Sequence, residues 1–125
     1  MVKILVIDDD QDILDFAKVC LGDRHEIATA LDGEAGLYAC ETTKFDLIIT
    51  DIFMPFRDGL DIIREALKLY PDIKIIAMTA RYGKAHTNYL KAAEVIGAAA
   101  QLRKPFTAED LISAVDQVMD QTVQV

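Results

Sequence analysis

The stretch ILVIDDD at residues 4–10 decides the fold, because a continuous apolar run leads directly into three carboxylates. Four consecutive apolar residues are typical of a strand that is covered on both faces, as in the parallel sheet of an α/β protein. Beyond the carboxylates, apolar residues recur at helical spacing, at Ile13, Phe16, Ala17 and Cys20. The segment therefore predicts a strand followed by a helix over residues 12–21.

The same alternation of apolar runs and helical segments continues along the chain. We predict strands over residues 4–7, 26–30, 47–51, 73–78 and 98–103. The helices between and after them are predicted at 12–21, at 33–42, between Gly59 and Pro71, at 84–95, and from Thr107 onward. Five βα units predict a three-layer, doubly wound α/β fold with a five-stranded parallel sheet. Of the few strand orders that right-handed crossovers allow, we expect the flavodoxin-like order 2-1-3-4-5.

The composition indicates one ordinary domain over residues 1–125, in which 52% of the residues are hydrophobic. Thirteen basic residues against 21 acidic ones give a formal net charge of −8, which argues against direct nucleic-acid binding. We expect no membrane segment, because no apolar run approaches the roughly 20 residues of a transmembrane helix. We also expect no signal peptide, because the first apolar run is too short for one and acidic residues follow it at once. Cys20 and Cys40 carry no metal or redox motif, so we expect buried thiols and a cytoplasmic protein.

Chemically active side chains follow four of the predicted strands, namely Asp8, Asp9, Asp10, Asp51, Thr79 and Lys104. In a doubly wound sheet, ligands bind at the carboxyl ends of the strands, where the strand order reverses. Carboxylates that converge there repel one another unless a cation neutralises them, and Mg²⁺ commonly takes one or two. We therefore predict a Mg²⁺ or Mn²⁺ site at Asp8, Asp9 and Asp51. A solvated turn or a helix cap is the alternative interpretation of residues 8–10.

The predicted set of side chains also has what phosphoryl transfer to a carboxylate requires. Asp51 offers a nucleophile, and the Lys104 ammonium can hold that carboxylate and stabilise the incoming charge. The Thr79 hydroxyl can donate to a phosphoryl oxygen. Neither Thr79 nor Lys104 identifies this function by itself, so the prediction depends on finding them together with the aspartates.

Four segments resemble, in order, the motifs of the receiver domains of two-component response regulators, and together they cover essentially the whole chain. These segments are ILVIDDD at 4–10, DIFMPFRDG at 51–59, MTA at 78–80 and LRKPF at 102–106. The resemblance implies that Asp51 accepts a phosphoryl group and that Asp8, Asp9 and the Phe53 backbone carbonyl surround Mg²⁺. It also implies a regulatory phosphoacceptor domain rather than an enzyme with an external substrate.

The resemblance further implies a set of partners and a switch. The phosphoryl group would come from a sensor histidine kinase or a histidine phosphotransfer protein, with Thr79 and Lys104 as partners of the phosphate. The Lys104–Pro105 bond would be cis. Movement of the threonine would then change the binding of a downstream protein or a separate output domain. Receivers of this family also pair as homodimers. We expect no output domain within residues 1–125.

We expect three residues to affect the switch and the lifetime of a phosphorylated state. The family usually places Tyr or Phe three residues before the lysine, but this chain has Gln101. An amide cannot fill an apolar slot, and burying it without a partner costs about 1–3 kcal/mol. We therefore expect signalling through loop and helix movement. Phe53 and Arg81 are expected to flank the pocket and control the access of water.

Two other functions fit parts of this pattern. A phosphohydrolase of the haloacid-dehalogenase type would use Asp8 as nucleophile and Asp10 as acid/base, but the chain is short and has no obvious cap insertion. A phosphorylation-independent interaction module is favoured by Gln101 and opposed by the complete acceptor set.

Overall fold

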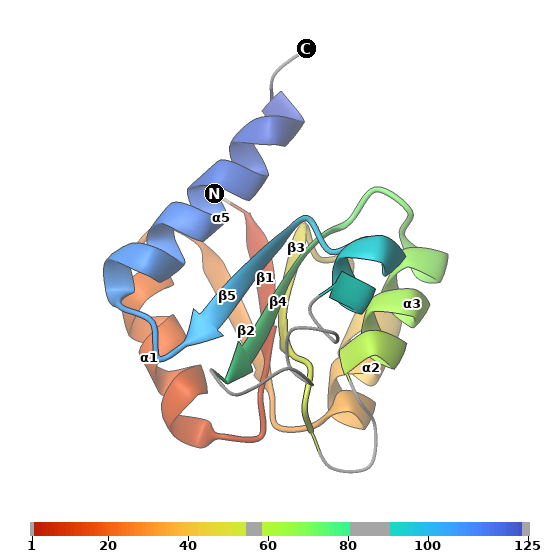
Figure 1. Ribbon diagram of the computed structural model, residues 1–125, viewed down its shortest axis with the longest axis horizontal. Coiled ribbons are helices and arrows are strands. Elements are labelled where there is room, and N and C mark those ends of the chain that lie inside the picture. The colour runs from red at the N-terminus through yellow and green to blue at the C-terminus, as the bar shows by residue number, and fades with distance from the viewer. Residues whose placement is uncertain (1, 55–58, 81–90, 124–125) are drawn as a thin grey trace.

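The computed structural model describes residues 2–54, 59–80 and 91–123. Five parallel strands form one sheet in the order β2-β1-β3-β4-β5, which confirms the predicted topology. The strands are β1 (Lys3–Ile7), β2 (Glu26–Ala30), β3 (Leu47–Asp51), β4 (Lys74–Ala80) and β5 (Ala100–Lys104). Helices α1 (Gln11–Leu21) and α5 (Ala108–Val123) cover one face of the sheet, and α2 (Gly33–Thr42) and α3 (Gly59–Leu69) cover the other (Figure 1).

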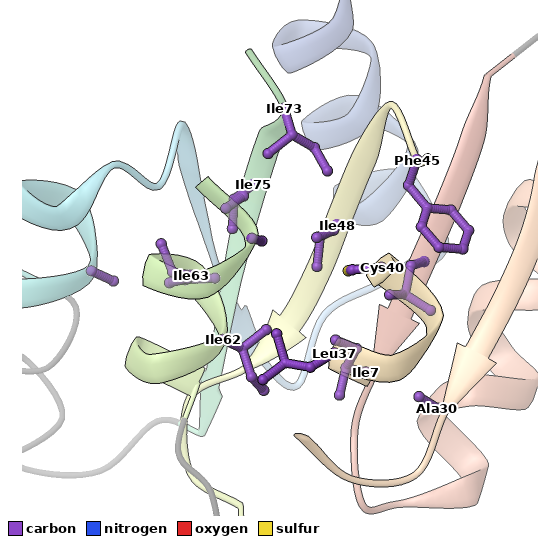
Figure 2. Packing of buried hydrophobic residues seen from close by; sticks show 14 of the residues in the cluster. Ile7, Ala30, Leu37, Cys40, Phe45, Ile48, Ile62, Ile63, Ile73 and Ile75 are labelled. Atoms are coloured by element: carbon purple, nitrogen blue, oxygen red, sulfur yellow. The ribbon is translucent and has the colours of Figure 1, made fainter. Parts of the chain in front are cut away.

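Burial on both faces explains why the central strands are continuously apolar. Along β1, Leu5 and Ile7 pack toward α2 and α3, whereas Ile4 and Val6 pack toward α1 and α5. Figure 2 shows the first of these two clusters, to which Ile48 of β3 and Ile62 of α3 also contribute. Full burial of such a side chain stabilises the fold by about 1.5–3 kcal/mol. The alternation therefore attaches helices to both faces and fixes the register of the sheet.

Capping residues hold the first turns of α2 and α5. The Asp32 carboxylate accepts a hydrogen bond from the Ala35 N–H at 2.8 Å and so caps the start of α2. At the start of α5, the Asp110 N–H donates to Thr107 Oγ1 at 3.0 Å, and the Thr107 N–H donates to the Asp110 carboxylate at 2.9 Å. Thr107 and Asp110 therefore form a reciprocal capping box in which Asp takes the usual place of Glu or Gln.

The boundaries of the last two strands differ from the prediction. β4 extends to Ala80, so Thr79 lies within this strand rather than after it, and β5 begins at Ala100 rather than at 98. Residues 91–96 are helical, and 84–90 of the predicted helix lie outside the described residues. Gly97, with φ +137°, follows the helix and ends it. The Ala98 N–H then still bonds to the Ala93 carbonyl, which delays the start of β5.

The two cysteines are free thiols, as predicted, although only one is fully buried. Cys40 lies in the core under α2, and burial raises the pKa of its thiol to about 11. Cys20 is half-buried. In the part of the chain that the structure describes, no helix combines the length and apolar character that crossing a membrane would require.

Candidate functional site

Two carboxylates meet at the carboxyl ends of the neighbouring strands β1 and β3. Asp8 directly follows β1, and Asp51 is the last residue of β3. Ile7 and Thr50 are paired in the register of these neighbouring strands, which brings the two aspartates side by side. Asp8 is fully buried, and Asp51 is 5% exposed. The predicted convergence of these side chains is therefore present.

The exposed Asp9 completes a cluster of three carboxylates. One oxygen each from Asp8, Asp9 and Asp51 lies within 4.8 Å of the other two. Hard oxygen ligands at this spacing form the donor set that Mg²⁺ prefers. Asp10 is not part of the cluster, because its side chain accepts the Asp12 N–H at 2.9 Å as the N-cap of α1. The helix-cap interpretation is therefore correct for Asp10.

Lys104 reaches both buried carboxylates from the end of β5. Its ammonium nitrogen lies 2.6 Å from Asp8 Oδ2 and 3.1 Å from Asp51 Oδ2. The second oxygens of these carboxylates accept backbone hydrogen bonds. Asp8 Oδ1 accepts the Asp10 N–H at 2.9 Å, and Asp51 Oδ1 accepts the Phe53 N–H at 3.2 Å. Both carboxylates are therefore held in position before any ligand arrives.

One ammonium group does not fully compensate the buried negative charge. Burial raises the pKa of Asp51 and of Asp8, and this effect exceeds the lowering by Lys104. Burial by itself would lower the pKa of Lys104, but the two carboxylates outweigh burial and raise it. Lys104 is therefore held protonated, while the pocket remains electrostatically unfavourable for its carboxylates. A second cation would relieve this strain.

Thr79 presents an unused hydrogen-bonding group at the same end of the sheet. Its side chain is 1% exposed, and Thr79 Oγ1 has no hydrogen-bond partner among the described residues. A buried hydroxyl without a partner costs about 1–3 kcal/mol. Its register partner on β5 is Arg103, the residue before Lys104. The hydroxyl is thus available to a ligand that offers an acceptor oxygen.

The remaining predicted residues have different positions. Gln101 is exposed on the edge strand β5, so the desolvation cost expected of a buried amide does not arise. Phe53 is 37% exposed, two residues beyond Asp51. The Lys104–Pro105 peptide bond is cis. Arg81 lies outside the described residues.

Two glycines that support the site were missed by sequence reasoning. A Cβ atom at Gly59 would collide with the Asp51 carbonyl oxygen and with Ile52 Cα. Its N–H donates to the Ile52 carbonyl at 2.8 Å, so the start of α3 lies directly on the acceptor strand. A Cβ atom at Gly36 would collide with Ile7, the residue before Asp8. The only sequence signal was a glycine inside a predicted helix, which suggests close packing.

An apolar hollow next to Lys104 was also missed. It has a volume of about 250 Å³ and is lined by Asp12, Ile13, Phe16, Lys104, Pro105 and Phe106. The rings of Phe16 and Phe106 contact each other with their centroids 6.1 Å apart. The sequence signal was Phe16 on a helix and Phe106 beside the lysine motif, but no sequence rule pairs these distant positions.

Comparison with known proteins connects this arrangement to a family. The family model of the response regulator receiver domain matches residues 4–116. The DNA-binding transcriptional regulator NtrC of Azospirillum brasilense is 38% identical over 120 residues, which make up 94% of this chain and 24% of that protein. This chain spans between about a quarter and about a half of the length of three such curated relatives.

Solved structures agree with this relationship. A response regulator receiver domain protein from Clostridium thermocellum is 38% identical, with a TM-score of 0.82 over 98% of this chain and 97% of that one. A CheY-like receiver domain protein from Methanospirillum hungatei is 30% identical, with a TM-score of 0.87 over 95% and 94% of the two chains. The chain belongs to the response regulator receiver domain family.

Proposed function

We propose that this receiver is a phosphorylation-dependent switch that accepts a phosphoryl group on Asp51 from a histidine kinase or a histidine phosphotransfer protein. The observation that carries the proposal is the environment of one carboxylate. Asp51 is buried at the end of β3, Lys104 lies 3.1 Å away, and the Asp8 and Asp9 carboxylates are within 4.8 Å. These groups match the requirements of a phosphoryl acceptor that works with a divalent cation.

The residues present fit Mg²⁺, or Mn²⁺ in its place. Three carboxylates converge, and their charge is only partly compensated by Lys104. Asp8, Asp9, Asp51 and the Phe53 backbone carbonyl would hold the cation. When bound, it supplies positive charge that offsets the negative charge of the phosphoryl oxygens.

The chain's own groups account for the transfer step. A carboxylate oxygen of Asp51 forms a bond to phosphorus as the phosphorus–nitrogen bond to the donor histidine breaks, which leaves an acyl phosphate. The Lys104 ammonium moves from two carboxylates to the added phosphoryl oxygens. The Thr79 hydroxyl gains the acceptor that it lacks among the described residues. The partners of Lys104 and Thr79 therefore change, which supplies the signal.

The lifetime of the acyl phosphate depends on the attack of water on phosphorus, which restores the carboxylate and releases inorganic phosphate. Phe53 is two residues beyond the acceptor, and its side chain is 37% exposed. A bulky apolar ring at this position hinders the approach of water. We infer that Phe53 slows hydrolysis and prolongs the signal. Arg81 is proposed to act at the same entrance.

The donor protein must reach the carboxyl end of the sheet. The hollow of about 250 Å³ between α1 and residues 104–106 places an apolar surface directly beside Lys104. Phe16 at its edge is 36% exposed, and Val19 further along α1 is 79% exposed. Exposed apolar side chains around a polar centre are typical of a protein interface. This surface supports a protein donor in addition to small phosphodonors.

The proposal also concerns the extent of the domain, its location and its partners. We propose that residues 1–125 act as one receiver unit in the cytoplasm, with Gln101 in an edge-strand surface that contacts partners. Phosphorylation would change the binding of this chain to a downstream protein, to a separate output domain or to a second copy of itself. We do not propose that this acidic domain binds nucleic acid directly. The phosphatase alternative draws no support from Asp10, because this side chain caps α1.

The proposal is tested by incubating the protein with acetyl phosphate and Mg²⁺ and measuring the phosphorylated fraction by intact-mass spectrometry. We expect a phosphorylated species that forms with Mg²⁺ or Mn²⁺ and fails to form with a chelator. Asp51→Asn abolishes it, whereas Asp116→Asn, an exposed carboxylate on α5, leaves it unchanged. Equal modification of the Asp51→Asn protein would refute the proposal in favour of another acceptor or of a phosphorylation-independent module.

A further inference from the structure

Helices α2 and α3 cover one face of the sheet (Figure 1). A second groove is lined by residues of these two helices. It has a volume of about 290 Å³ and is lined by Glu34, Leu37, Tyr38, Glu41, Glu65 and Leu69. None of these residues belongs to the acceptor cluster. The volume is at the lower end of the range for ligand pockets, which suits an inserted side chain better than a whole cofactor.

The apolar part of the groove is unusually exposed. Tyr38 is 69% exposed and Leu69 is 44% exposed, although Leu37 between the helices is buried. Seven large hydrophobic side chains are exposed among the described residues, and two of them converge here from different helices. Single exposed hydrophobics need no explanation, but a converging pair around a depression marks a docking surface.

The polar part of the groove has one sign of charge. Its three charged lining residues are all glutamates, and no lysine or arginine lines it within the described part of the chain. Lys68 pairs with Glu65 at 3.4 Å on the outside of α3, but this ion pair is exposed. Such a pair contributes about 0–1 kcal/mol, so a partner's cation can replace it. The groove is therefore complementary to a basic ligand.

The spacing of the lining residues indicates the shape of that ligand. Glu34, Leu37, Tyr38 and Glu41 recur on α2 at helical intervals, so they form one stripe about 10 Å long with a carboxylate at each end. Glu65 and Leu69, four residues apart, form the opposite wall on α3. An amphipathic helix laid between two helices presents side chains at the same intervals.

We propose that the α2–α3 groove docks a basic amphipathic helix of a partner protein. One apolar side chain of this helix would sit against Leu37, Tyr38 and Leu69, and flanking lysines or arginines would meet Glu34, Glu41 and Glu65. The Tyr38 ring also offers its face to a cation. The proposal concerns a surface separate from the acceptor site and does not require phosphorylation of Asp51.

The test uses a synthetic amphipathic peptide of leucine and lysine, together with a matched peptide in which glutamate replaces lysine. Binding is measured by backbone amide NMR of the full chain with saturating Mg²⁺, which occupies the competing carboxylate cluster. We expect the lysine peptide to shift the resonances of the groove residues and to bind more weakly at high salt. We expect the glutamate peptide to cause no shift.

Two variants and a control locate the contact. We expect Tyr38→Ser to weaken binding about five- to thirtyfold, the range typical of an interface anchor. Glu41→Lys should weaken it about tenfold, whereas Glu109→Lys, the same charge change on α5, should leave it unchanged. Both target side chains are exposed, and the dispersion of the amide resonances of each variant without peptide serves as a check of folding. Equal loss in the Glu109→Lys control, shifts confined to other surfaces, or no binding of the lysine peptide would overturn the proposal.

Discussion

The contact of Lys104 with two buried carboxylates leads to a prediction about stability. Lys104→Met removes the ammonium group at 2.6 Å from Asp8 and 3.1 Å from Asp51 and retains an apolar stem. Removing one partner of a buried ion pair typically costs about 3–5 kcal/mol, because the other charge remains buried. The Lys104 side chain is only 19% exposed, so solvent screens this loss little. We therefore expect a loss of about 3–5 kcal/mol without Mg²⁺ at about pH 8.

The size of this loss depends on pH in a defined direction. Burial already raises the pKa values of Asp8 and Asp51 above the ordinary 3.8, so the folded state binds their protons more tightly than the unfolded state does. Their contribution to the free energy of unfolding therefore decreases as the pH rises through the folded-state pKa values. Lys104→Met raises both pKa values further. The penalty should consequently shrink toward acidic pH, where the carboxylates are protonated.

Urea denaturation of the wild type and of Lys104→Met, at pH values on both sides of neutrality and with or without Mg²⁺, measures these effects. Lys74→Met, a half-buried lysine at the start of β4, serves as the control and should lose much less. Mg²⁺ should recover part of the loss in Lys104→Met, because a bound cation stabilises the folded state by mass action. A loss below about 1 kcal/mol, or a loss that grows toward acidic pH, would refute this electrostatic explanation.

Three further predictions concern individual residues. Thr79→Val should stabilise the fold by about 1–3 kcal/mol in urea denaturation, because it removes a buried hydroxyl that has no partner among the described residues. The same change should abolish the phosphorylation-dependent chemical shift changes in β4. Gly59→Ala should destabilise the fold by about 1–3 kcal/mol in urea denaturation, because its Cβ collides with the Asp51 carbonyl. Phe53→Asn should shorten the lifetime of phosphorylated Asp51, measured by loss of the phosphorylated mass; an unchanged lifetime would rule out a barrier to water.

The fold and the acceptor cluster were predictable because both depend on short-range patterns. Apolar runs such as residues 4–7 identify strands, and the residues that follow them must gather at one edge of a parallel sheet. Asp8 and Asp51 could therefore be brought together from their positions alone, once the strand order was assumed. The capping residues Asp32 and Thr107 were predictable for a similar reason, because they bond to N–H groups only three residues away.

Features that depend on the packing of distant segments could not be predicted in the same way. The contact of Lys104 with Asp51 was predicted, but Lys104 also reaches past β4 to contact Asp8, and no local pattern shows this second contact. The need for glycine at position 59 becomes visible only when α3 lies on the acceptor strand. The groove at Tyr38 and Leu69 depends on how two helices pack side by side. The exposure of Gln101 likewise followed from its edge strand rather than from its residue type.

The most direct test of the central claim identifies the residue that carries the phosphoryl group. The protein is treated with acetyl phosphate and Mg²⁺, the acyl phosphate is reduced with borohydride, and the modified aspartate is located by peptide mass spectrometry. The buried Asp51 carboxylate, held by Lys104 beside the acidic cluster, is predicted to be the modified residue. Modification of Asp8 with Asp51 unchanged would contradict the switch mechanism and favour a phosphatase.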